Sequence, residues 1–181
     1  MINESNEIKD FLFDYLNKSE DQTLISELKF SDIIDNVLEN CFDKVVSIGK
    51  KEESLAILAT GLLHYLLTNA LISSQRKVEF NGINVDIVIP DLKTLEGDAK
   101  KTLILFIVDT DNEIIIKQRI AELYKIQPNK ENIWIISGKN YSISNKIYVI
   151  EKKNSSFSNI IFDIAKFVNV QGQSKLKILR I

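Results

Sequence analysis

The segment Lys77-Val-Glu-Phe-Asn-Gly-Ile-Asn-Val-Asp-Ile-Val-Ile89 is predicted to form a β-hairpin. Asn81-Gly82 separates two runs rich in β-branched and aromatic residues, and this dipeptide favours a two-residue turn because both positions tolerate a positive φ. Pro90 follows at once and is expected to end the second strand. Because no earlier part of the chain carries a strand pattern, the hairpin marks the change from a helical region to an α/β region.

Three helices are predicted before the hairpin, because apolar residues recur at spacings of three and four over 7–17, over 32–46 and after Glu53. Ser31 is expected to cap the second of them. Residues 54–75 carry no charge and are long enough to cross a bilayer. Their polar seam of Thr60, His64 and Thr68 favours a buried central helix instead, and we expect no association with a membrane.

The segments after the hairpin alternate between strands and helices. A polar loop is predicted over 92–101, and the apolar run 102–108 is typical of a central strand covered on both faces. The further elements are a helix over 114–124, strands over 133–137, 147–151 and 176–181, and a helix over 156–168. The fold class is therefore an α/β three-layer sandwich with a mixed central sheet, in which an N-terminal helical region, 1–49, packs on an α/β core, 50–181.

Composition narrows the possible functions of the 181 residues. The formal net charge is −2, but residues 1–75 carry −7 and residues 76–181 carry +5, so polyanion contacts are expected in the second part. The chain has one cysteine and one histidine, Cys41 and His64, which excludes an internal disulfide and the usual structural zinc sites. We interpret Cys41 as a structural thiol and His64 as a hydrogen-bonding residue. No glycine-rich phosphate loop is present, and a cytoplasmic location is expected because no secretory signal is recognisable.

Carboxylates near two strand ends are the remaining candidates for chemistry. Asp86 is the one carboxylate of an otherwise apolar strand, and Asp109, Asp111 and Glu113 follow the predicted central strand. Cleavage of a phosphodiester requires divalent cations held by such carboxylates, commonly with a lysine that helps to activate water. Asp86 and Asp109 are therefore the candidate ligands for Mg²⁺ or Mn²⁺.

The order of these elements over 52–151 resembles that of the restriction-endonuclease-like (PD-(D/E)XK) nuclease superfamily, which includes Holliday junction resolvases. The resemblance implies that Asp86 matches the metal-binding aspartate of the second core strand. It also implies an acid, a spacer and a lysine on the central strand, where this chain has Ile107-Val-Asp109. A literal match to the motif, Pro90-Asp91 with Asp98-Ala-Lys100, brackets a loop, and we interpret it as chance.

Three hypotheses follow from this resemblance and its missing residues. The first is a non-catalytic protein of the nuclease-like fold that acts in nucleic-acid association or subunit interaction, without a cofactor. The second is an active metal-dependent DNA nuclease whose relocated site consists of Asp86, Asp109, Lys117 and Glu53. The third is a homo-oligomeric interaction module, such as a homodimer. DNA or RNA is expected to contact the basic residues of the second half. These are Arg76-Lys77, Lys100-Lys101, Lys152-Lys153, Lys175, Lys177 and Arg180.

Overall fold

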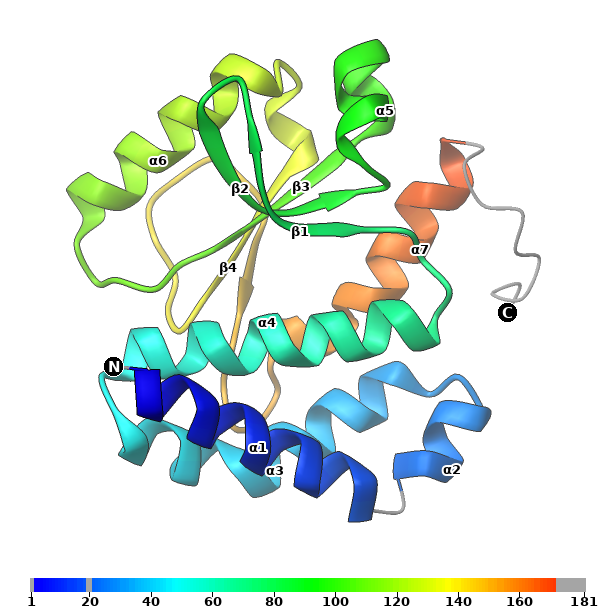
Figure 1. Cartoon of the computed structure of the whole chain (residues 1–181), viewed down its shortest axis with the longest axis vertical. Coiled ribbons are helices and arrows are strands. Elements are labelled where there is room, and N and C mark those ends of the chain that lie inside the picture. Colours follow the sequence, from blue (N-terminus) through cyan, green and yellow to red (C-terminus); the bar gives the residue numbers. More distant parts are fainter. Residues whose placement is uncertain (1, 19–20, 172–181) are drawn as a thin grey trace.

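A computed structural model describes residues 2–18 and 21–171, and it shows a five-stranded mixed sheet with helices on both faces (Figure 1). The α/β class predicted from the sequence is confirmed. The predicted strand over 176–181 and the basic residues Lys175, Lys177 and Arg180 lie outside the described residues.

Four helices precede the sheet: α1 (Ile2–Lys18), α2 (Asp21–Ser26), α3 (Phe30–Ile48) and α4 (Lys51–Asn69). Helix α2 was not predicted, because six residues are too few to show a helical period. The predicted cap at Ser31 is wrong, since α3 begins at Phe30 and no side chain caps it. Thr60 and Thr68 of the polar seam donate hydrogen bonds to carbonyls one turn earlier in α4, so their hydroxyl groups find partners within the helix.

The strands lie in chain order across the sheet: β1 (Gln75–Phe80), β2 (Ile83–Ile89), β3 (Leu103–Ile107), β4 (Ile133–Ser137) and β5 (Ile147–Val149). The first three form the predicted antiparallel meander, and β4 runs parallel to β3 after a helical crossover, also as predicted. Asn81 and Gly82 have φ values of 51° and 75°, which confirms the turn expected of this dipeptide.

Between the strands lie α5 (Leu92–Gly97), η1 (Ala99–Lys101), α6 (Glu113–Ile126) and η2 (Lys130–Asn132), and η3 (Ser156–Asn159) leads into α7 (Ile160–Val170). The loop predicted over 92–101 is wrong, because α5 and η1 occupy most of it. Asp91 and Asp98 make these short helices possible by accepting hydrogen bonds from backbone amides, Thr94 N at 2.7 Å and Lys100 N at 3.2 Å.

The sheet separates two apolar cores. On one face α4 packs against β3 and β4, and α1 and α3 lie beyond α4, so the N-terminal helices share one core with the sheet (Figure 1). On the other face α6 covers β2, β3 and β4. All five residues of β3 are buried, as expected of a strand covered on both faces. Helix α4 is thus the central buried helix that its charge-free sequence indicates.

Candidate functional site

A cleft of about 630 Å³ opens where α1 and α4 meet the β1–β2 hairpin and the carboxyl end of β3. Open α/β sheets commonly bind ligands in crevices outside the carboxyl ends of their strands. The charged residues lining this cleft are Glu4, Lys9, Glu53, Lys77, Asp86 and Asp109. The cleft is the candidate functional site because it combines this location with groups of both charges from four different elements.

Glu53 reaches the cleft from the first turn of α4. A carboxylate is favourable there because the unpaired amides at a helix N-terminus carry partial positive charge. The carboxylate of Glu53 also lies 3.3 Å from Lys50 Nζ, and both side chains are well exposed. The sequence-predicted grouping of Glu53 with Asp86 and Asp109 around one opening therefore occurs in the structure.

The hairpin changes faces at Lys77 and Asp86. Ile83 and Val85 pack in the core under α6, whereas Ile87 and Ile89 pack in the core around α4. A regular strand would put all four side chains on one face, since side chains alternate with a period of two. The pairing Arg76↔Ile87 and Val78↔Val85 continues on both sides of Lys77, whose φ is 48°. The left-handed residue therefore rotates the strand without inserting an extra residue.

Asp86 lies where β2 separates from β3. The ladder between these strands ends at Ile87↔Leu105, and the Asp86 carboxylate accepts a hydrogen bond from Ile107 N at 2.9 Å in place of the next ladder bond. Burial raises the pKa of Asp86 above its usual range, and the charge of Asp109 adds to this; the Ile107 bond, Arg119 and Lys77 oppose it. One carboxylate oxygen thus has a structural role next to the cleft.

The end of β3 presents Ile107 and Asp109 to the cleft. Ile107 is 6% exposed and belongs to the core around α4, whereas Asp109 is exposed. Ile107 stands at the position where the resemblance implies a carboxylate. The cleft is consequently lined by an apolar side chain where that family would have a bridging metal ligand.

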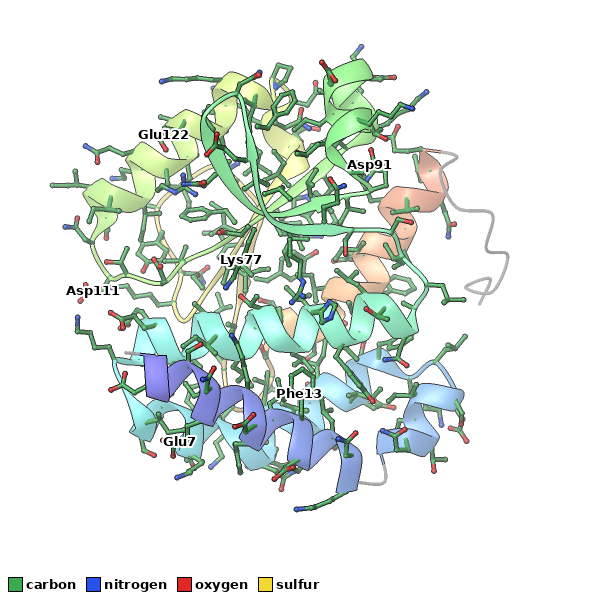
Figure 2. The ribbon with its side chains drawn as sticks, viewed as in Figure 1. Glu7, Phe13, Lys77, Asp91, Asp111 and Glu122 are labelled. Atoms are coloured by element: carbon green, nitrogen blue, oxygen red, sulfur yellow. The ribbon has the colours of Figure 1, made fainter. Side chains whose placement is uncertain are left out.

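The predicted catalytic residue Lys117 is not among the residues that line the cleft. It lies in the second turn of α6 and pairs with Glu113 at 3.7 Å, with both side chains largely exposed. Lys77 lies at the cleft instead, between the hairpin and α4 (Figure 2). The two-residue turn at 81–82 pairs Lys77 with Asp86, but the sequence does not show that the strand rotates there and brings Lys77 to the cleft.

The remaining residues considered in the sequence analysis lie outside the cleft. His64 is partly exposed on α4, and burial together with the nearby Arg76 lowers its pKa. Cys41 is fully buried in the core. Asp91 and Asp98, the acids of the literal motif match, accept the amide hydrogen bonds that start α5 and η1. None of these four residues is among those that line the cleft.

The described part of the chain contains no group of three or more His, Cys, Asp and Glu side chains arranged to hold a metal ion. Asp86 and Asp109 fit a more limited role, since Mg²⁺ is often bound by one or two protein carboxylates with water and substrate phosphate as the other ligands. The assignment of these two residues as metal ligands stays a prediction.

The basic pairs do not gather at one place. Lys77 lines the cleft, whereas Lys100 and Lys101 precede β3 at its opposite end, and Lys101 pairs with Asp98 at 3.5 Å. Lys152 follows β5 and forms an ion pair with Asp43 of α3. None of Lys100, Lys101, Lys152 and Lys153 is among the residues that line the cleft.

Comparison with known proteins does not identify the chain. No protein-family model matches it, and no curated protein and no solved structure matches it significantly.

Among the helices of residues 2–18 and 21–171, none combines the length and the apolar character needed to cross a bilayer.

Proposed function

We propose that this chain is a non-catalytic protein with a nuclease-like fold that associates with nucleic acid through the cleft at the end of β3. The observation that carries the proposal is Ile107. Its apolar side chain lines the charged cleft, and its amide donates a hydrogen bond to one carboxylate oxygen of Asp86. The cleft keeps lysines that suit a phosphate but lacks the carboxylate that a bridging metal would require.

Two lysines support nucleic acid as the ligand. Lys9 on α1 and Lys77 on β1 lie on different walls of the cleft. No ion pair of the described residues includes either one. The four carboxylates of the cleft repel a phosphate backbone, so we expect modest affinity that falls as salt increases.

Titration of labelled single-stranded and duplex DNA and RNA, followed by fluorescence anisotropy at several salt concentrations, tests the proposal. We expect saturable binding that weakens as salt increases, because each neutralised phosphate releases a counterion. The same samples with excess Mg²⁺ or Mn²⁺ should show intact strands on a denaturing gel. Absence of binding at low salt would contradict the nucleic-acid role, and cleavage would contradict the non-catalytic one.

An active metal-dependent nuclease is the second candidate, and one observation favours it: Glu53, Asp86 and Asp109 share the cleft with Lys77. In this case Asp86 and Asp109 would hold the cation, which would stabilise charge on the phosphate, and Lys77 would replace Lys117 as the amine near the attacking water. Any cleavage should then disappear in both Asp86→Ala and Asp109→Ala. Cleavage that survives both changes would come from a contaminant.

A homodimer stays a prediction that light scattering coupled to gel filtration would test. A monomeric mass over a range of concentrations would remove it.

A further inference from the structure

The backbone conformation of Lys77 is unusual for its residue type. Its φ of 48° lies in the left-handed region, inside a strand whose pairing with β2 continues on both sides. Glycine adopts this region freely and asparagine tolerates it, whereas a long side chain adds a steric cost. Backbone strain of this kind is concentrated at functional sites, where the surrounding structure maintains it.

The change of faces in the hairpin accounts for the left-handed backbone but not for the lysine. Rotation of the strand is what moves Ile87 and Ile89 into the core around α4 after Ile83 and Val85 have packed under α6. Glycine at position 77 would allow the same rotation with less strain. What the lysine adds at this position is a positive charge, since Lys77 lines the cleft and lies close enough to Asp86 to lower the pKa of its carboxyl group.

We propose that Lys77 is the main phosphate-binding residue of the cleft, and that its ammonium group contacts a non-bridging oxygen of a nucleic-acid backbone. This inference rests on the function proposed above and adds the group that performs it. Lys9 of α1 also lines the cleft and would contact a second phosphate. Neither residue is the lysine that the resemblance implies, since that position is occupied by Asp109.

Substitution of Lys77 by Gln tests the inference, with Lys125→Gln as the control of equal net charge. Lys125 is exposed in the last turn of α6 and does not line the cleft. For the labelled DNA, we expect Lys77→Gln to weaken binding at least roughly fivefold and to lower the slope of log K against log salt by about one. Lys125→Gln should change the affinity less than about twofold.

A second variant, Lys77→Gly, separates the backbone from the side chain. It keeps the left-handed conformation available, so it should remain folded by circular dichroism and still lose affinity as Lys77→Gln does. Wild-type affinity in either folded variant would overturn the inference and leave the proposed function intact. Failure of the wild-type protein to bind any of the DNA or RNA probes would overturn both.

Discussion

The cleft and the start of β5 both contain lysine and aspartate side chains, but these side chains differ in how many partners they have within the protein. At β5, Asp163 of α7 accepts hydrogen bonds from Lys146 Nζ at 2.8 Å and from Tyr148 OH at 2.6 Å. The ammonium group of Lys146 lies over the rings of Trp134 and Tyr148, at 4.6 and 4.8 Å from their centroids. Every polar group of this cluster has a partner within the protein, and together they fasten α7 to the edge of the sheet.

In the cleft, the corresponding groups have fewer partners. Asp86 accepts one backbone hydrogen bond, and no ion pair of residues 2–18 and 21–171 includes Lys77 or Asp109. A charge with a full set of partners contributes to the fold, whereas a charge that keeps free hydrogen-bonding capacity is available to a ligand. This difference is why we assign a structural role to the β5 cluster and a binding role to the cleft.

The largest effect is expected where a carboxylate replaces the apolar side chain of Ile107 in the cleft lining. Ile107→Glu should lower the free energy of unfolding by about 2–4 kcal/mol without metal, because it places a charge at a buried position beside Asp86. It should also create a cation site, so that Mn²⁺ raises the melting temperature and EDTA reverses the gain.

Ile107→Gln is the matched control, since it is as large and polar but carries no charge. We expect a smaller loss of stability, because no charge is buried, and no response to Mn²⁺. A response in this variant, or in the wild-type protein, would mean that the cleft already has enough ligands and that the contrast with the β5 cluster is wrong.

Removal of the acceptor at β5 should have the next largest effect. Asp163→Ala leaves the hydroxyl of Tyr148 without its partner, and Tyr148 is only 2% exposed. We expect a loss of about 1–3 kcal/mol in chemical denaturation, the cost of an unsatisfied buried polar group. Asp109→Ala in the cleft should change stability by less than about 0.5 kcal/mol. Equal losses would remove the distinction between the two regions.

The two carboxylates should also respond to pH in opposite directions. Burial acts to raise the pKa of Asp163, but the hydrogen bonds from Lys146 and Tyr148 outweigh it and lower this pKa. Its stabilisation is therefore present above the unfolded-state pKa of about 3.9 and is lost as pH falls through the folded value. The pKa of Asp86 is raised, so its contribution is present below about pH 3.9 and is lost as pH rises through the folded value.

Asp163→Asn and Asp86→Asn make this prediction measurable by urea denaturation across the acidic and neutral range. The Asp163→Asn variant should be less stable than wild type near neutral pH, and the difference between the two should shrink in acid. Asp86→Asn can still accept the Ile107 hydrogen bond, and it should equal or exceed wild type near neutral pH by less than about 1 kcal/mol. A large loss in Asp86→Asn would contradict the raised pKa.

The smallest effect concerns the strain at Lys77. Lys77→Gly removes the cost of a left-handed lysine but adds the entropy of glycine in a strand, so we expect a change within about 1 kcal/mol of zero. Thermal unfolding of this variant measures the balance. A loss well beyond that range would show that the lysine side chain supports the fold, as Lys146 does at β5.

Sequence patterns predicted the elements whose signals are local. The Asn81-Gly82 turn, the apolar run of β3 and the uncharged part of α4 after Glu53 were all recognisable, because each depends on a few adjacent residues or on one uniform period. The six-residue helices α2 and α5 were not found, since they are too short to show a period. For the cleft, Glu53, Asp86 and Asp109 were expected together, whereas Lys117 lies outside the lining and Lys77, which is part of it, was not expected there.

By itself, the amino-acid sequence determined the antiparallel hairpin, the central strand and the apolar residue Ile107 at the end of that strand. Only the tertiary structure decided that β2 changes faces at Asp86. The alternating apolar residues of β2 would also fit a regular strand with all of them on one face. Which face each residue occupies depends on the helices that cover the two ends of the strand. That rotation directs Lys77 to the cleft and brings the Asp86 carboxylate to the amide of Ile107. Which charges meet in the cleft is set by packing on both sides of the sheet, and a local pattern does not contain that information.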